Sequence, residues 1–118
     1  MEICVLNSGS SGNCIFVATG GQRLLIDVGL RLRTLRARLG ELALDVNDID
    51  SVLVTHEHGD HCAGLPALVK TCPRLRLIAN EGTATGVETF ARGRFSGTWD
   101  IFETGASFDL DFLRVETF

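Results

Sequence analysis

Residues 51–61, SVLVTHEHGDH, join a short apolar segment to all three histidines of the protein. The segment 51–55 places an apolar run, Val-Leu-Val, between a serine and a threonine, which predicts a short buried strand. His56, His58, Asp60 and His61 follow this strand directly. Because α/β folds place their sites at the ends of strands, the pattern H-x-H-x-D-H predicts a functional site rather than a plain polar turn.

These four side chains offer the donor atoms that zinc and iron accept, namely imidazole nitrogens and carboxylate oxygens. In an extended segment, His56 and His58 point to the same side and can bind one metal ion. Asp60 and His61 come as the chain turns into a helix and can face a second ion. Paired metal ions activate water near neutral pH. The zinc-protease pattern H-E-x-x-H is excluded, because Asp60 stands where its second histidine is required.

The remaining residues of this segment and the cysteines predict structure rather than ligation. Glu57 is interpreted as a loop carboxylate, and Cys62 as a small buried residue that begins a helix. The first apolar run, residues 1–6, lacks a basic region and a cleavage site and is interpreted as a strand rather than a signal peptide. No two cysteines form a C-x-x-C pair. The cysteines therefore predict reduced thiols in a cytoplasmic protein, at positions Cys4, Cys14, Cys62 and Cys72.

Outward from the histidines, the sequence predicts alternating strands and helices. Strands are expected over residues 2–7, 14–18, 23–28, 75–79 and 110–118, and helices over 32–42, 63–71 and 81–91. Gly20-Gly21 predicts a two-residue hairpin turn, and Pro66 fits the first turn of its helix. Residues 92–108 are rich in glycine and left open. The order of elements predicts a mixed α/β fold.

Composition sets wide limits on function. The 118 residues suit one domain, and 45% apolar with 22% charged residues is the balance of a soluble globular protein. No run of 18 apolar residues occurs, which excludes a transmembrane helix. The net charge is −4, and its whole acidic excess lies in residues 100–118. The chain is not broadly basic, so charge alone does not predict nucleic-acid binding.

At this point the sequence resembles the metallo-β-lactamase fold, whose metal signature looks like residues 52–61. Three further segments, LNSGSSGN at 6–13, LIDVG at 25–29 and IAN at 78–80, follow in the order of the YycJ/WalJ-like branch of bacterial hydrolases. The resemblance implies an αββα sandwich, with residues 1–118 as the N-terminal portion of that domain.

The resemblance also implies two metal ions, zinc with iron or manganese as alternatives, and a role for each ligand. His56 and His58 would hold the first metal, and Asp60 and His61 the second. Asp60 would also orient or deprotonate the attacking water. Asp27 would order the metal-binding loop. The alternative, that Asp27 only shapes the turn before Gly29, is left equally open. Members of this branch are described as phosphodiesterases that act on DNA, so DNA is the expected partner and no membrane is involved.

Two interpretations of the loop at residues 8–12 remain open, since its backbone amides could bind a phosphate or it could be a flexible turn. The resemblance implies a third histidine for the first metal, a bridging aspartate and another histidine after the late strand, whereas no histidine follows His61 here. We therefore expect half a fold, with weak or no activity and an apolar sheet face through which the chain could self-associate. The alternatives are a non-catalytic metal-binding or interaction half-domain, and another hydrolase of this fold such as a thioesterase, a lactonase or an RNA-processing enzyme.

Overall fold

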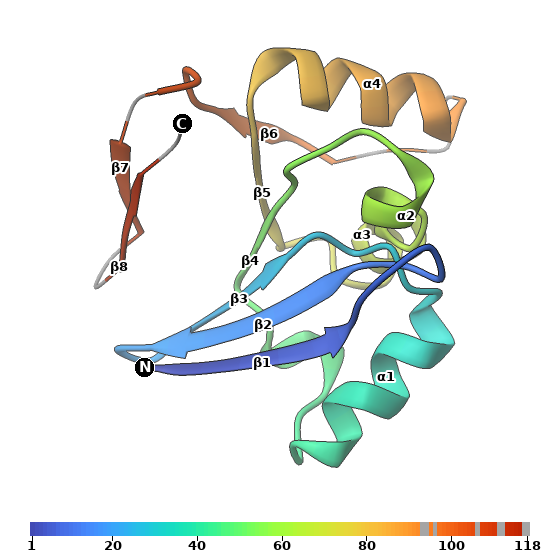
Figure 1. Cartoon of the computed structure of the whole chain (residues 1–118), viewed down its shortest axis with the longest axis vertical. Helices are drawn as coiled ribbons and strands as arrows, with labels where there is room; N and C mark the ends of the chain where they lie inside the picture. Colours follow the sequence, from blue (N-terminus) through green and yellow to red (C-terminus); the bar gives the residue numbers. More distant parts are fainter. Residues whose placement is uncertain (93–94, 96, 106, 111–112, 117–118) are drawn as a thin grey trace.

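The computed structural model describes residues 1–92, 95, 97–105, 107–110 and 113–116. Up to residue 91 its elements follow the predicted order, with one additional short helix at 59–62 (Figure 1). The strands are β1 (Glu2–Asn7), β2 (Cys14–Thr19), β3 (Gln22–Ile26), β4 (Ser51–Leu53), β5 (Arg76–Ala79), β6 (Trp99–Ile101), β7 (Ser107–Leu110) and β8 (Leu113–Glu116). The helices are α1 (Leu32–Glu41), α2 (Gly59–Cys62), α3 (Leu65–Thr71) and α4 (Glu81–Ala91), with a 3₁₀ turn η1 (Val46–Asp48). The predicted mixed α/β class is confirmed.

Six strands form one mixed sheet in the order β1-β2-β3-β4-β5-β6. β1, β2 and β3 are antiparallel neighbours, whereas β3, β4, β5 and β6 run parallel to one another. Gly20 and Gly21, with φ of 54° and 82°, connect the paired residues Thr19 and Gln22. Positive φ at both positions gives the twist that a two-residue hairpin needs, so the predicted turn is confirmed. The parallel strands bring their carboxyl ends to one edge of the sheet.

The helices bury their leucine stripes against one face of this sheet. Leu35 and Leu39 of α1 are fully buried, as are Leu65 and Leu68 of α3 and Val87 of α4. Spacings of three or four residues put each pair on one side of its helix, which is why the sequence pattern located the core. The central strand β3 buries both Leu24 and Leu25, which point to opposite faces of the sheet.

The opposite face of the sheet carries a smaller apolar cluster. Val17, Leu24 and Ile78 are buried there, with partly buried Ile15, Ile26, Leu53 and Phe102 packed against them. Ile3 and Val5 of β1 pair with Val17 and Ile15 and are 66% and 60% exposed. The apolar face that the sequence predicts is therefore present among the described residues.

The C-terminal part differs from the prediction. A single strand was expected over residues 110–118, of which 111, 112, 117 and 118 lie outside the described residues. Instead, β7 and β8 pair antiparallel with Ser107 opposite Glu116, and this hairpin stands at the left of Figure 1, away from α1, α2 and α3. Alternating apolar and polar residues fit one long strand or two short ones, so periodicity could not place the break. Within the described ranges, every helix is too short or too polar to cross a lipid bilayer.

Close packing of the chain around α3 gives a stability prediction. A Cβ at Gly64 would lie 1.7 Å from the Leu30 carbonyl oxygen, whereas a Cβ at Gly40 would meet no atom within 4 Å. We expect Gly64→Ala to lower the free energy of unfolding by about 1–3 kcal/mol, because rigid backbone must move. Gly40→Ala, within α1, should raise it by roughly 0.5–1 kcal/mol. Urea unfolding of both variants measures this, and equal effects would contradict it.

Burial of the Cys14 thiol gives a pH prediction. Burial, followed by the charge of Asp27, raises the pKa of Cys14 to about 12, whereas an unfolded thiol ionises near about 8.5. Between these values only the unfolded state releases the proton. The free energy of unfolding should therefore fall with rising pH by up to about 1.4 kcal/mol per pH unit.

Cys62, whose pKa is raised to about 11, and Cys72, whose pKa burial also raises, add to this decline. The chain has no tyrosine and a single lysine, Lys70, so removing Cys14 measures the share of this thiol. Cys14→Ala should flatten the decline measured by urea unfolding between about pH 9 and 11. Val17→Ala, which also removes buried atoms from β2, should lower stability without changing the slope. An unchanged slope in Cys14→Ala would show that this thiol does not titrate as expected.

Candidate metal centre

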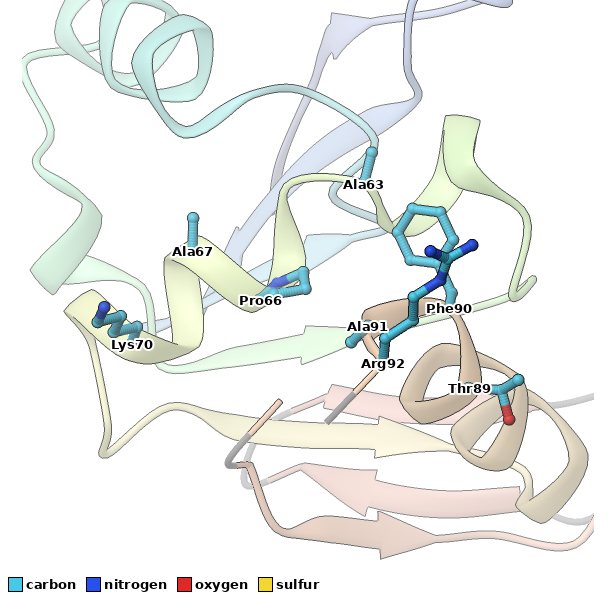
Figure 2. Close-up of a pocket in the computed structure, with 8 residues that line it drawn as sticks. All are labelled: Ala63, Pro66, Ala67, Lys70, Thr89, Phe90, Ala91 and Arg92. Carbon is cyan, nitrogen blue, oxygen red and sulfur yellow. The ribbon is translucent and has the colours of Figure 1, made fainter. Parts of the chain in front are cut away.

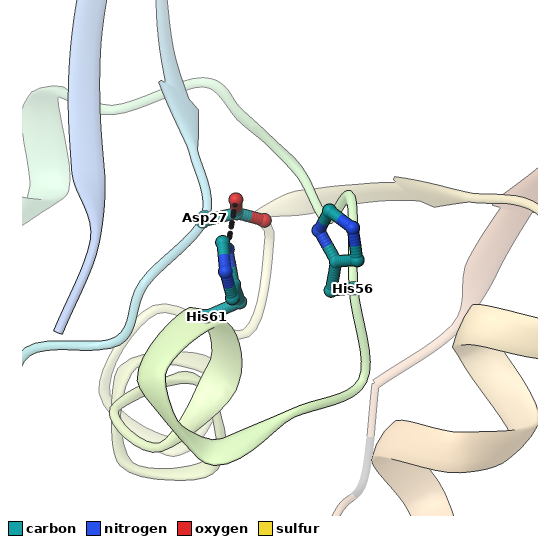
Figure 3. Close-up of side chains that lie close together, drawn as sticks. All are labelled: Asp27, His56 and His61. Carbon is teal, nitrogen blue, oxygen red and sulfur yellow. Dashed lines mark hydrogen bonds and ion pairs between the residues drawn. The ribbon is translucent and has the colours of Figure 1, made fainter. Parts of the chain in front are cut away.

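The predicted site residues gather where β3 and β4 end side by side. Asp27 directly follows β3, and His56 lies three residues beyond the end of β4. The two strands are parallel neighbours, with Ile26 paired with Leu53. The Asp27 amide donates a hydrogen bond to the Leu53 carbonyl (2.8 Å). Figure 3 shows Asp27 and His61 facing each other, with His56 across from them on the loop that follows β4.

Asp27 is a buried carboxylate with a full set of donors. Its side chain accepts from the Thr55 amide at 2.7 Å, from the Thr55 hydroxyl at 2.6 Å and from His61 Nδ1 at 2.7 Å. The residue is 5% exposed, and its φ of 64° is positive. Aspartate tolerates this backbone conformation better than most residues. Three donors compensate the cost of burying its charge, so Asp27 is a built element of the site and more than a turn aspartate.

The same carboxylate sets the proton positions on two histidines. Because a carboxylate only accepts, His61 Nδ1 carries the proton, which leaves a lone pair on His61 Nε2. The Thr55 hydroxyl donates to Asp27, so its oxygen is free to accept from His56 Nδ1, which lies 2.9 Å away. His56 Nε2 then also keeps its lone pair. Histidines that bind metal ions are held in this way through their other ring nitrogen.

The short helix α2 presents the remaining predicted ligands. His58 occupies its N-cap position, and its carbonyl accepts from the amides of His61 and Cys62. This turn places the Asp60 carboxylate 3.6 Å from His61 Nε2. The Asp60 carboxylate therefore lies near the open nitrogen of His61.

The sequence pairs His56 with His58, but in the structure the His56 ring lies closer to His61. The ligand atoms of Asp27, His56 and His61 all lie within 4.8 Å of one another. The His56 ring centre is 4.6 Å from that of His61 and 6.2 Å from that of His58. His56 thus lies nearer to His61 than to His58, because the turn into α2 folds His61 back over the strand ends. Spacing along the chain could not show this approach.

The donor set fits a divalent metal ion. Asp27 is occupied by three donors and supports the histidines, whereas His56 Nε2, His61 Nε2 and the Asp60 carboxylate are open to a ligand. His58 is exposed beside them. Imidazole nitrogen with carboxylate oxygen suits zinc, iron or manganese. Two complete sites need more donors than these residues supply.

Cys62 is buried as predicted, although it ends α2 and does not begin a helix, and Glu57 lies in the loop between β4 and α2. Cys62 Sγ donates to the carbonyl oxygens of Glu57 at 3.1 Å and His58 at 3.2 Å. Burial, followed by the charges of Asp27, Glu57 and Asp60, raises the pKa of Cys62 to about 11. A protonated thiol that bonds to backbone carbonyls is not placed to bind a metal ion. Glu57 is exposed, and all four cysteines are free thiols.

The loop at residues 8–12 is ordered by internal hydrogen bonds. The Gly12 amide donates to the Gly9 carbonyl, and the Gly9 amide donates to Asn13 Oδ1. The Asn13 amide donates to the Asp60 carbonyl. These three amides are therefore engaged within the protein, which argues against a phosphate cradle built from them. Sequence reasoning missed Asn13 and Thr55, although a hydroxyl residue directly before a predicted ligand histidine was a usable signal.

A separate cleft of about 990 Å³ opens between α3 and the end of α4 (Figure 2). Phe90, Lys70 and Arg92 line it together with small apolar residues, and none of the four predicted ligands does. Lys70 lies in the last turn of α3 and Arg92 is the C-cap of α4. Cations at these positions offset the helix dipole, so Lys70 and Arg92 have a structural explanation that does not involve the metal centre.

The carboxylate of Asp27 can be tested without any metal. Asp27→Asn should lower the free energy of unfolding by roughly 1–3 kcal/mol, because an amide cannot accept from every donor that surrounds it. The His61 ring should then exchange between neutral tautomers, which NMR of the imidazole nitrogens detects. Asp100→Asn breaks an exposed ion pair with Arg76 and should have little effect. An Asp27→Asn protein with wild-type tautomer and stability would contradict this role.

Comparison with known proteins shows the family to which the chain belongs. The family model of the metallo-beta-lactamase superfamily matches residues 8–105. A Bacillus anthracis protein named exodeoxyribonuclease YycJ is 35% identical over 118 residues, which is 100% of this chain and 44% of that protein. A Streptococcus pneumoniae protein named exodeoxyribonuclease WalJ is 34% identical over 119 residues, covering 97% of this chain and 43% of that protein. The chain thus spans less than half the length of these relatives.

Comparison with solved structures agrees with the family match. A metallo-beta-lactamase structure from Cronobacter sakazakii superimposes with a TM-score of 0.70 at 22% sequence identity, covering 92% of this chain and 46% of that chain. This likeness confirms the fold expected from the sequence, of which the chain matches rather less than half. Together with the family match over most of its length, it shows that the chain belongs to the metallo-beta-lactamase superfamily.

Proposed function

We propose that the protein is a metal-dependent hydrolase of the nuclease type, which cleaves phosphodiester bonds in DNA. The observation that carries this proposal is the buried Asp27 carboxylate, which leaves His56 Nε2 and His61 Nε2 open beside Asp60. Its identity of 35% to a protein named as an exodeoxyribonuclease favours DNA as the substrate. Residues 1–118 would form the N-terminal portion of the metallo-β-lactamase-like domain, in a cytoplasmic protein.

We assign the ligands as the sequence predicts them. His56 and His58 hold the first metal ion, and Asp60 and His61 hold the second, with zinc as the first choice and iron or manganese as alternatives. When bound, such ions polarise the phosphoryl oxygens and lower the pKa of water. Asp27 and the Thr55 hydroxyl keep His61 and His56 in the tautomers that ligation requires.

Asp60 is the residue of this chain that handles the proton of the attacking water. Its carboxylate is half-buried, which keeps it accessible to a water molecule. It orients the water and accepts one proton as the oxygen bonds to phosphorus. The bond from phosphorus to the leaving sugar oxygen breaks, and that oxygen takes up a proton. Removing the Asp60 carboxylate therefore affects both ligation and proton transfer.

The donors counted above set a limit on the activity of these residues alone. Two closed metal sites need more ligands than His56, His58, Asp60 and His61 provide. We therefore propose that the 118 residues by themselves are weakly active or inactive, and that full activity needs further ligands.

One alternative of a different class has an observation in its favour. The sheet face with exposed Ile3 and Val5 could bind a second copy of the chain, which would make this a non-catalytic metal-binding or interaction module. Thioesterases, lactonases and RNA-processing enzymes of the same fold remain alternatives within the hydrolases.

The proposal predicts a sharp difference between two neighbouring carboxylates. In the full-length protein, Asp60→Asn should lower metal-dependent cleavage of end-labelled DNA at least about 100-fold, because one substitution removes a ligand and the proton acceptor. Glu57→Gln makes the same chemical change at an exposed carboxylate that is not assigned as a ligand, and it should keep wild-type activity.

Metal content and substrate range separate the alternatives. The wild-type protein should contain two metal ions per chain and should cleave DNA in preference to RNA, a thioester or a lactone. Preference for one of the other substrates would reassign the substrate class. A protein that binds one metal ion, forms a stable dimer and cleaves none of them would favour the non-catalytic module.

A further inference from the structure

We propose that Asn13 is a positioning residue that fixes the Asp60 carboxylate, and that the Ser/Gly loop at residues 8–12 serves to hold Asn13 in place. The inference rests on the proposed function only in taking Asp60 as a metal ligand. This inference gives the loop a role other than phosphate binding, for which the amides of Gly9, Gly12 and Asn13 are not free.

Asn13 contacts Asp60 at three points across a large separation in the sequence. The Asn13 amide donates to the Asp60 carbonyl oxygen at 2.6 Å. Its side-chain Nδ2 lies 3.1 Å from the same carbonyl and 3.4 Å from Asp60 Oδ2. Both the backbone and the carboxylate of Asp60 are therefore held by one residue that precedes β2.

The loop holds the Asn13 side chain from the other side. Asn13 Oδ1 accepts from the Gly9 amide at 3.1 Å, and Nδ2 lies 3.2 Å from the Gly9 carbonyl. Asn7 Nδ2 closes the loop by donating to the Gly12 carbonyl at 2.6 Å. With its amide oxygen bonded to Gly9, the Asn13 side chain cannot turn over and exchange its oxygen with its nitrogen without breaking these contacts.

Gly29 makes the assembly tight. Its amide donates to the Asn13 carbonyl at 2.9 Å. A Cβ at this position would lie 1.9 Å from the Asp60 carbonyl oxygen and 2.6 Å from the Asn13 amide nitrogen. Only glycine allows these three backbones to approach so closely. A displacement of Asn13 must therefore be transmitted to Asp60.

The chemical effect is on the rotation of the Asp60 carboxylate. Oδ2 lies between the Asn13 amide group and His61 Nε2, at 3.4 Å and 3.6 Å. Asn13 Nδ2 shares its two hydrogens among the Gly9 carbonyl, the Asp60 carbonyl and Asp60 Oδ2. The shared bond restrains rotation about the Cβ–Cγ bond of Asp60 and keeps its carboxylate beside the open nitrogen of His61, where both could bind one metal ion. A carboxylate at position 13 would repel Asp60, and an alanine would leave it free to rotate.

The test uses the full-length protein, freed of metal and titrated with Zn²⁺ by calorimetry. The binding step that depends on Asp60 is identified as the one that Asp60→Asn removes. Asn13→Asp should weaken this step about 10–100-fold, as removal of residues that orient metal ligands generally does. The step that depends on His56 and His58 should keep its affinity. Asn13→Ala should act in the same direction with a smaller effect.

Two controls separate positioning from a general loss of structure. Asn80→Asp makes the same chemical change at the N-cap of α4, where a carboxylate can still accept from the Thr83 amide. It should leave both binding steps unchanged. Asn7→Ala loosens the loop without contacting Asp60, and its effect on the Asp60 step should be smaller than that of Asn13→Asp. Hydrogen exchange of the metal-free variants reports whether the fold is retained.

Each result bears directly on Asn13. Selective loss of the Asp60 step in a folded Asn13→Asp protein supports positioning. Wild-type binding by Asn13→Asp, equal loss of both steps together with unfolding, or wild-type binding by Asp60→Asn would each overturn it. DNA cleavage is measured separately, so a wild-type protein that binds zinc but cleaves no DNA would contradict the proposed function and leave the result for Asn13 standing.

Discussion

The buried carboxylate of Asp27 is the interaction on which the rest of the site depends. It lies at the end of β3, where the neighbouring parallel strand β4 also ends, and it accepts from the Thr55 amide, the Thr55 hydroxyl and His61 Nδ1. A buried charge is stable only when such donors surround it. Because these donors belong to the histidine-bearing segment, satisfying Asp27 also fixes where His56 and His61 direct their free nitrogens.

The site is held from two directions that meet at α2. Asp27 restrains the ring of His61 from the strand side, and Asn13 contacts Asp60 from the loop side. The α2 turn carries both restrained residues, one after the other. Glycine at position 29 lets the supporting backbones approach closely enough for this. Precise placement of ligands by surrounding hydrogen bonds is what metal sites in proteins generally require.

The two faces of the sheet differ in how far they are covered. Its helical face is covered by α1, α3 and α4, whereas its other face carries exposed Ile3 and Val5. The chain matches less than half of the relatives' length, and its donors fall short of two complete metal sites. The described residues thus contain the candidate ligands His56, Asp60 and His61 with the residues that support them. They also contain one apolar face that remains available for packing.

The sequence by itself determined most of the elements up to residue 91 and the candidate donor residues. Periodicity located the helices of the core, Gly20-Gly21 located the hairpin, and residues 56–61 identified the predicted ligands, because these signals are local. Only the tertiary structure decided that His56 lies closer to His61 than to His58, that Thr55 links His56 to Asp27, and that Asn13 holds Asp60. Residues 47 positions apart meet only when β-strand pairing and glycine packing bring them together, and no local pattern encodes that approach.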